Sequence, residues 1–165
     1  MQSIILCGFM ASGKSAVGRA LARRLHLPYI DTDALLESTF HTTIPEMFAA
    51  KGEAYFRDRE HDIAKIAAGL SDHVISTGGG MLTFPRNAAL LKNSGTIVYL
   101  SRNFDTLYAL LSRDTSRPLA RGKSKEEIWA LHDSRMAAYQ SCARFTVQND
   151  GTIEECVDKI LSLLP

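Results

Sequence analysis

Short apolar runs alternate with longer amphipathic stretches along the chain, and this alternation predicts strands and helices in turn. Five runs have the length and character of buried strands: Ser3–Cys7, Pro28–Ile30, His73–Ser76, Thr96–Leu100 and Phe145–Val147. The stretches between them repeat apolar residues at helical spacing, as Val17, Ala20 and Leu21 do after the first run. Strands that alternate with helices form βαβ units, so we expect one parallel sheet covered by helices on both faces.

Three capping boxes mark places where helices begin: Thr43-x-x-Glu46, Ser124-x-x-Glu127 and Thr152-x-x-Glu155. In each, the hydroxyl accepts the N–H three residues on, and the glutamate accepts the N–H of the capping residue. We expect Gly52 to interrupt the helix that the first box opens. Further helices are expected from the second strand to about Phe40, near Pro85–Lys92, and over Phe104–Ser112.

The segment Gly8–Ser15 has the spacing G-x-x-x-x-G-K-[ST] of a phosphate-binding loop, and it lies between a predicted strand and a predicted helix. Successive backbone N–H groups and the positive end of the new helix suit a phosphate. Lys14 adds a charge for the β- and γ-phosphates, and Ser15 offers a hydroxyl to Mg²⁺. The alternative is a glycine-containing turn before a helix.

Composition narrows the class of protein. The 165 residues suit a single domain, and a net charge of +1 provides no overall field to recruit nucleic acid or an anionic membrane. No run of about 18 apolar residues exists to span a membrane. The N-terminus lacks the basic region and apolar core of a signal peptide. We therefore expect a cytoplasmic protein, acting as a monomer, with no nucleic-acid or membrane partner.

The cysteines and histidines do not suggest a metal site. Cys7, Cys142 and Cys156 are scattered and form no C-x-x-C pair, which favours buried free thiols over a disulfide or a metal centre. The five histidines form no pair at ligand spacing. We expect them to be surface residues or satisfied structural residues.

Two aspartates, Asp31 and Asp33, alternate directly beyond the second strand. One could reach Mg²⁺ through water while the other faces a second substrate. Phosphoryl transfer benefits from a carboxylate that accepts the proton of the acceptor hydroxyl, and Asp33 is the candidate. The alternative is that Asp33 only caps the helix that follows.

Two arginines are candidate anion-binding residues, each with a structural alternative. Arg57 either belongs to a solvated helix face paired with Glu53, or grips a carboxylate while Glu60 fixes its orientation. Arg135, with Tyr139 one turn later, is either a second anion clamp or a surface arginine.

Two segments suggest close contact with a ligand. The triplet Gly78–Gly80 follows the third strand and either presents bare backbone to a ligand or serves as a flexible connector. The segment from about 113 to 123 carries Arg113, Arg117 and Arg121. It is either a solvated basic loop or a lid that closes over nucleotide phosphates.

Taken together, these motifs resemble the shikimate kinase family over about the whole chain. The matching segments, in order, are the phosphate loop, Asp31-Thr32-Asp33, Phe56-Arg57-x-x-Glu60, Thr77-Gly78-Gly79-Gly80, Arg113 with Arg117-Pro118-Leu119, and Arg135-x-x-x-Tyr139. The resemblance implies a three-layer P-loop kinase fold, similar to nucleoside monophosphate kinases, with five parallel strands in the order 2-3-1-4-5. It also implies transfer of the ATP γ-phosphate to the 3-hydroxyl of shikimate, a step of aromatic amino-acid biosynthesis.

The resemblance further implies roles for individual residues. The residues implied to bind ATP are Gly8, Ala11, Ser12, Gly13, Lys14, Ser15, Ala16, Arg113 and Arg117. Arg113 is expected to stack on adenine. Ser15 and Asp31 are implied to bind Mg²⁺. Lys14, Asp33 and Arg117 are implied to be catalytic. The residues implied to bind shikimate are Asp33, Arg57, Gly78, Gly79, Gly80 and Arg135. The two arginines are expected to bind the carboxylate of shikimate. The acceptor-binding region then spans about residues 32–60, and the lid about 113–123.

Two positions depart from the family pattern. Ala11 stands where the family's loop usually has a further glycine, so its backbone either avoids left-handed angles or accepts roughly 1–2 kcal/mol of strain. Gln148-Asn149-Asp150 matches the adenine-side loop only weakly.

Two other functions stay open at this point. One is a related kinase acting on another hydroxylated carboxylic acid. The other is a catalytically silent nucleotide-binding regulator, which should have lost Lys14, Asp33 or a lid arginine, although all of these are present.

Overall fold

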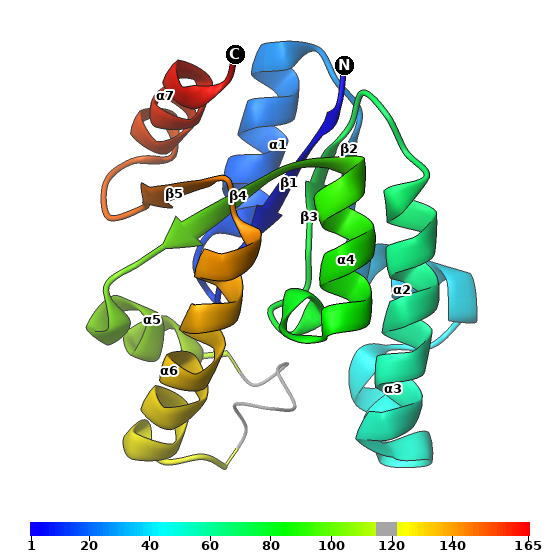
Figure 1. The fold of residues 1–165 in the computed structure, drawn as a ribbon. Coiled ribbons are helices and arrows are strands. Elements are labelled where there is room, and N and C mark those ends of the chain that lie inside the picture. Colours follow the sequence, from blue (N-terminus) through cyan, green and yellow to red (C-terminus); the bar gives the residue numbers. More distant parts are fainter. Residues whose placement is uncertain (115–121) are drawn as a thin grey trace.

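The computed structural model describes residues 1–114 and 122–165. Five parallel strands form one sheet in the order β2-β3-β1-β4-β5 (Figure 1). The strands are β1 (Ser3–Cys7), β2 (Tyr29–Asp31), β3 (Val74–Ser76), β4 (Gly95–Ser101) and β5 (Phe145–Gln148). The predicted parallel sheet and its strand order are confirmed.

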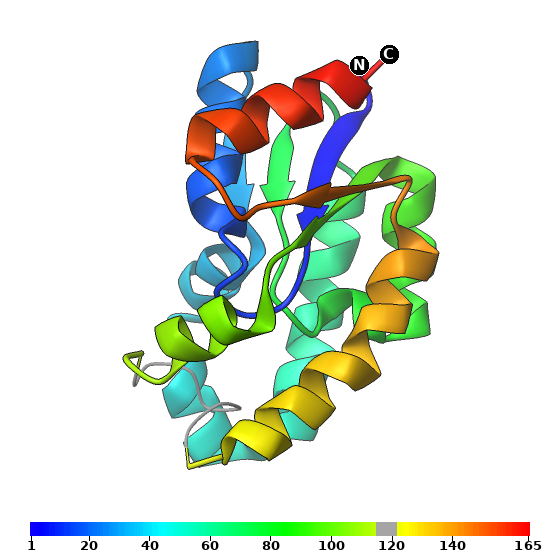
Figure 2. The same cartoon turned by 90° about the vertical axis from the view of Figure 1, so that its left-hand side faces the viewer.

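The helices form a layer on each face of this sheet. They are α1 (Lys14–Leu25), α2 (Thr32–Phe40), α3 (Ile44–Ala68), α4 (Pro85–Ser94), α5 (Phe104–Leu111), α6 (Lys125–Cys142) and α7 (Ile153–Leu163), with a short 3₁₀ turn η1 (Met81–Thr83). Helices α1 and α7 cover one face, and α3, α4 and α6 cover the other (Figure 2). This arrangement follows from βαβ connections that place helices on both sides of a parallel sheet.

Alternation along β1 divides the apolar interior into two cores. Ile4 and Leu6 point to the face covered by α1 and α7, while Ile5 and Cys7 point to the face covered by α3, α4 and α6. Successive side chains of a strand point to opposite faces, so a run that is apolar throughout is buried on both sides. All three cysteines are buried free thiols, as expected from their spacing.

The local signals in the sequence are matched by the helix ends. Thr43, Ser124 and Thr152 each form a complete capping box at the start of α3, α6 and α7. Gly52 interrupts α3 with a non-helical backbone (φ 81°, ψ 175°), as expected. Strand β2 begins one residue later than expected and includes Asp31. Pro28 lacks an N–H and contributes only its carbonyl, which accepts the N–H of Val74.

The carboxyl ends of the strands meet at one edge of the sheet, and the motifs gather there. The phosphate loop follows β1, Asp31 ends β2, and the glycine triplet follows β3. Helices α2 and α3 on one side, and α5 and α6 on the other, extend beyond this edge (Figure 1). In open α/β sheets ligands bind at this edge. None of the helices in the described ranges is long and apolar enough to cross a membrane.

Candidate active site

The loop between β1 and α1 has the backbone that a phosphate-binding loop requires. Gly8 and Gly13 adopt positive φ angles of 151° and 93°. A Cβ on Gly8 would lie 2.6 Å from the carbonyl oxygen of Leu100, so no larger residue fits there. Lys14 begins α1, and its Nζ donates to the carbonyls of Gly8 and Phe9 at 2.8 Å each. The ammonium group is therefore held across the mouth of the loop.

Ala11 adopts the left-handed conformation, with φ at 63°. Of the two possibilities open from the sequence, the loop therefore accepts the strain, roughly 1–2 kcal/mol for a residue with a Cβ. A backbone in this region persists only where its surroundings hold it. The carbonyl of Ala11 accepts a hydrogen bond at 3.1 Å from Nη1 of Arg102, which follows β4.

Asp31 joins the phosphate loop to the start of α2. Its Oδ2 accepts the hydroxyl proton of Ser15 at 2.8 Å, and its Oδ1 accepts the N–H groups of Asp33 and Ala34 at 2.9 and 3.2 Å. Asp31 is thus the capping residue of α2, and the alternative that Asp33 caps this helix is wrong. Asp33 lies two residues further on, in the first turn of α2, and lines two cavities.

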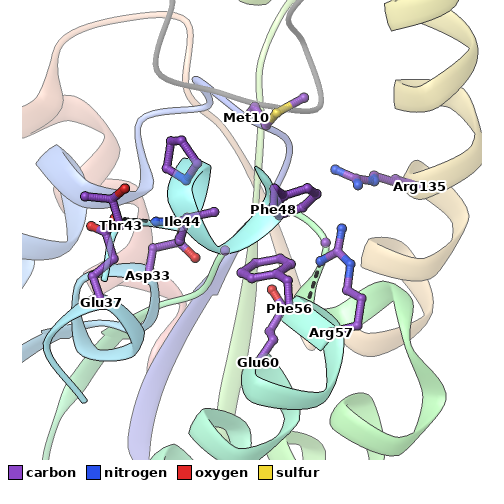
Figure 3. Close-up of a pocket in the computed structure, with 14 residues that line it drawn as sticks. Met10, Asp33, Glu37, Thr43, Ile44, Phe48, Phe56, Arg57, Glu60 and Arg135 are labelled. Atoms are coloured by element: carbon purple, nitrogen blue, oxygen red, sulfur yellow. Dashed lines mark hydrogen bonds and ion pairs between the residues drawn. The ribbon is translucent and has the colours of Figure 1, made fainter. Parts of the chain in front are cut away.

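Two cavities meet at Asp33. The first, of about 440 Å³, lies between α2, α3 and α6, and we call it the apolar-walled cavity because Met10, Ile44, Phe48 and Phe56 line it (Figure 3). The second, of about 430 Å³, is lined by the loop residues from Ala11 to Ala16, and we call it the phosphate-loop cavity. Asp33, Gly78 and Gly79 line both. A group bound in one cavity can therefore react with a group bound in the other at this shared wall.

Bare backbone in the glycine triplet makes this junction possible. A Cβ on Gly78 would lie 2.6 Å from Oδ1 of Asp33, and a Cβ on Gly80 would lie 2.5 Å from Nη1 of Arg57. Gly78 is also anchored, because its N–H donates to the hydroxyl of Thr32 at 3.0 Å. The triplet is thus packed against charged side chains, and the flexible-connector alternative does not describe it.

Arg57 is buried on α3, with only 7% of the residue exposed. Its Nη1 donates to Oε1 of Glu60 at 2.8 Å, and its guanidinium carbon lies 5.0 Å from the ring centres of Phe56 and Phe84. A longer contact of 3.5 Å joins Nη2 to Glu53. The alternative of a solvated helix face is wrong, because the guanidinium lies between aromatic rings at the wall of the apolar-walled cavity.

Arg135 reaches the same cavity from α6 and is also 7% exposed. Its Nη1 is buried and has no hydrogen-bond partner within residues 1–114 and 122–165. Burial lowers the pKa of Arg135, and the nearby Arg57 cation acts in the same direction. Figure 3 shows the guanidinium groups of Arg57 and Arg135 reaching toward the cavity from different elements. Two buried guanidinium groups, each with an N–H group unpaired among the described residues, have the charge and donors that suit an anion.

Glu60 and Tyr139 hold the two sides of this anion site. Burial raises the pKa of Glu60, and the adjacent Arg57 opposes that rise without cancelling it. The phenol of Tyr139 donates to the carbonyl of Gly79, and burial raises the pKa of this phenol. Tyr139 therefore fixes the peptide group between Gly79 and Gly80. The N–H of this peptide group belongs to Gly80, which lines the cavity.

The predicted nucleotide residues are only partly brought together. Ser12, Gly13, Lys14, Ser15 and Ala16 line the phosphate-loop cavity. Gly8 contributes through its carbonyl. Arg113 is exposed in the turn after α5, where the neighbouring Asp114 lines this cavity. Arg117 and Arg121 lie outside the described residues, and so does most of the expected lid.

Several residues at the site were not predicted. Met10, Ile44, Phe48 and Phe56 line the apolar-walled cavity, although the sequence assigned none of them a binding role, because an apolar cavity wall has the same periodicity as a packed core. Arg102 contacts the phosphate loop without any motif to mark it, and Asn149, from the weakly matching Gln148-Asn149-Asp150 segment, contacts the same loop. The prediction that the histidines are surface residues or satisfied structural residues is wrong for His132. It is buried against Phe9, Phe104 and Trp129, and its Nδ1 lacks a partner among the residues that the structure describes.

Comparisons with known proteins agree with this geometry. A protein from Enterococcus faecalis named shikimate kinase is 37% identical, with 99% of each chain covered. One of the same name from Ruegeria pomeroyi is 37% identical over 99% of this chain and 85% of its own.

Solved structures agree as well. A shikimate kinase from Acinetobacter baumannii in complex with shikimate superimposes with a TM-score of 0.95 at 33% identity, covering 99% of this chain and 92% of that one. A shikimate kinase from Aquifex aeolicus gives a TM-score of 0.84 at 35% identity, over 97% and 94% of the two chains. A family model described as shikimate kinase matches residues 10–165. This chain therefore belongs to the shikimate kinase family.

Proposed function

We propose that this protein transfers the γ-phosphate of ATP to the 3-hydroxyl of shikimate. The observation that carries this proposal is the position of Asp33 at the shared wall of the apolar-walled and phosphate-loop cavities. One cavity carries a complete phosphate-binding loop, and the other carries two buried arginines. The A. baumannii relative whose structure contains shikimate supports this assignment of the acceptor.

The acceptor carboxylate binds between Arg57 and Arg135. A planar guanidinium donates two parallel hydrogen bonds to a carboxylate, and burial strengthens both because water does not compete. Glu60 holds Arg57 in its orientation through the 2.8 Å contact. The backbone of Gly78–Gly80 approaches the acceptor ring closely, and Ile44, Phe48 and Phe56 pack against its apolar edge.

The nucleotide phosphates bind in the phosphate loop. The N–H groups of the loop and the start of α1 point positive charge at them. Lys14 then exchanges its contacts with the Gly8 and Phe9 carbonyls for contacts with the β- and γ-phosphates. We propose that adenine stacks on Arg113 and that Arg117 closes over the phosphates within a lid of about residues 113–123.

The oxygen atoms at the loop fit Mg²⁺. Ser15 and Asp31 place a hydroxyl and a carboxylate 2.8 Å apart, and hard oxygen donors are the ligands that this ion prefers. Within the described ranges no three His, Cys, Asp or Glu side chains cluster as a metal site. Phosphate oxygens and water would therefore complete the coordination. When bound, the ion neutralises charge on the phosphates.

Asp33 acts on the acceptor hydroxyl. It orients the hydroxyl toward the phosphate-loop cavity and takes its proton as the phosphoryl group transfers. The transition state of phosphoryl transfer is loose, so orientation supplies much of the benefit. We further propose that the protein acts in the cytoplasm as a monomer of one domain, without nucleic-acid or membrane partners.

An ATP-consumption assay with separate acceptors tests this function. We expect turnover with shikimate and little with quinate, gluconate or nucleosides. A preference for one of the other hydroxylated carboxylic acids would replace shikimate as the acceptor and leave the kinase chemistry in place. Binding of ADP without turnover of any acceptor would favour a silent regulator instead.

A further inference from the structure

Two side chains at the ends of neighbouring strands hold the outer side of the phosphate loop. Asn149 follows β5, and its Nδ2 donates to the carbonyl of Ser12 at 2.8 Å. Arg102 follows β4, and its Nη1 donates to the carbonyl of Ala11 at 3.1 Å. We call Arg102 and Asn149 the loop clamp. Its two contacts span 91 and 137 residues of sequence.

The clamp fixes two consecutive peptide groups of the loop. In the Ala11–Ser12 peptide, the carbonyl is held by Arg102 and the N–H donates to the carbonyl of Phe9 at 3.2 Å. In the Ser12–Gly13 peptide, the carbonyl is held by Asn149. A trans peptide is planar, so the N–H of Gly13 points away from Asn149. Gly13 lines the phosphate-loop cavity, where an anion would meet this N–H.

Asn149 is built into the fold at this place. It is only 4% exposed, and its own N–H donates to the carbonyl of Ser101 at 2.7 Å, continuing the pairing of β4 and β5. A Cβ on Gly13 would lie 2.5 Å from Nδ2 of Asn149, so the amide and the loop are in close contact. Burying an amide is costly unless it is hydrogen-bonded, and the Ser12 carbonyl is the partner of this one.

The two clamped peptide groups lie between residues with unusual backbone angles. Ala11 and Gly13 have φ values of 63° and 93° and flank Ser12. Without outside contacts, a loop with a strained alanine would relax toward other conformations, and its N–H groups would no longer converge. The clamp opposes that relaxation, because it holds the carbonyls at both peptide groups between these residues.

We propose that Asn149 and Arg102 are positioning residues for the nucleotide phosphates, holding the Gly13 N–H in place for them. This inference rests on the proposed function, because it assumes that the loop binds a nucleotide. Asn149 is the stronger member, since it is buried and holds the Ser12–Gly13 peptide, which carries the Gly13 N–H. Arg102 is half-buried and supports the preceding peptide.

The test compares Asn149→Asp, Asn149→Ala and Arg102→Met with the wild type. Asn149→Asp keeps the size of the side chain but turns a carboxylate oxygen toward the Ser12 carbonyl. Asn103→Asp is the matched control: Asn103 is exposed, follows Arg102 directly and caps α5 through its side-chain oxygen, which aspartate also provides. It adds the same charge near the clamp without touching the loop.

Three measurements separate positioning from general destabilisation. Calorimetry gives the Kd for ADP, inhibition kinetics give the Ki for inorganic tripolyphosphate, and steady-state kinetics give the KM for shikimate. We expect the Asn149 variants to weaken the binding of ADP and of tripolyphosphate by similar factors of about tenfold. Arg102→Met should weaken the binding of both by about threefold. The KM for shikimate should change by less than about twofold. Thermal unfolding verifies that each variant is folded, and Asn149→Ala carries the test if Asn149→Asp does not fold.

The possible results have distinct meanings. Unchanged ADP and tripolyphosphate affinity in folded Asn149 variants would overturn the clamp and leave the proposed function standing. An ADP affinity and a shikimate KM that worsen by equal factors would also overturn it, because this indicates general distortion. A loss of ADP affinity in Asn103→Asp equal to that in Asn149→Asp would overturn it too, because this indicates an effect of charge alone. Absence of ADP binding by the wild type would reject the proposed function and the clamp with it.

Discussion

Arg57 and Glu60 form a buried ion pair one turn apart on α3, with 2.8 Å between Nη1 and Oε1. Their side chains are 8% and 2% exposed, so neither charge is solvated by bulk water. Burial alone would favour the neutral form of Glu60, and the contact with Arg57 opposes this. The pair therefore keeps a cation at the wall of the apolar-walled cavity.

Removing the acidic partner should therefore cost both stability and acceptor binding. We expect Glu60→Ala to lower the free energy of unfolding by about 3–5 kcal/mol, because it leaves Arg57 as a buried charge without its close partner. Urea unfolding measures this loss. Glu53→Ala is the control, because Glu53 is exposed and contacts Arg57 at 3.5 Å, and it should cost less than about 1 kcal/mol. Similar costs for both would show that the buried contact has no special weight.

Replacing either buried arginine by lysine should weaken acceptor binding selectively. Lysine keeps the charge but lacks the planar fork, so Arg57→Lys and Arg135→Lys should each weaken shikimate binding by about tenfold or more. Calorimetry should show ADP binding almost unchanged. The control is Arg59→Lys, because Arg59 lies on the same helix and pairs with Asp62. Equal weakening of ADP and shikimate would contradict the assignment of the carboxylate to these arginines.

Lys14→Met should nearly abolish turnover while the protein stays folded. The charge that neutralises the β- and γ-phosphates is lost, and we expect kcat to fall by at least about 10²-fold. Lys65→Met removes an exposed lysine from α3 and should have no effect on turnover. Circular dichroism checks the fold of both variants. Near-normal turnover in folded Lys14→Met would reject the phosphate-loop assignment.

The two aspartates should separate by function. Asp33→Asn keeps the shape of the side chain but cannot accept a proton, so kcat should fall by about 10²–10⁴ with little change in ADP affinity. Asp31→Asn should instead raise the Mg²⁺ concentration required for half-maximal activity, because Asp31 contacts Ser15. If Asp33→Asn turns over normally and Asp31→Asn loses acceptor binding, the two roles are reversed.

His132 should make the stability depend on pH below neutrality. Burial lowers the pKa of His132 below its usual value of 6.5, and the nearby Asp133 opposes this only in part. The unfolded chain therefore takes up this proton first as the pH falls. Stability is fully present above about pH 6.5 and is lost as the pH falls through the lower folded pKa.

Urea unfolding between about pH 5 and pH 8 measures this dependence. His132→Phe should flatten the loss between pH 8 and pH 5 relative to the wild type, because Phe9, Phe104 and Trp129 can pack against the new ring. His26→Asn is the control, because His26 is exposed and has a left-handed backbone that asparagine tolerates. This variant should leave the slope of stability against pH unchanged. An unchanged slope in His132→Phe would show that His132 is not the group responsible.

The sequence by itself determined the features that depend on neighbours along the chain. Strand and helix order follows from the period of apolar residues, the helix starts at Thr43, Ser124 and Thr152 follow from capping boxes, and the loop at Gly8–Ser15 follows from its spacing. Each of these depends on interactions within a few residues, so the local pattern contains the necessary information.

Only the tertiary structure decided between alternatives that depend on distant neighbours. Arg57 fits a solvated helix by its spacing to Glu53, yet it is buried because Phe84 and the glycine triplet pack over it from elsewhere in the chain. Asp31 rather than Asp33 caps α2, because β2 extends to Asp31. Asn149 reaches Ser12 across 137 residues, because β5 ends beside the loop in the assembled sheet. Such contacts arise from packing, which brings together residues that no local spacing relates.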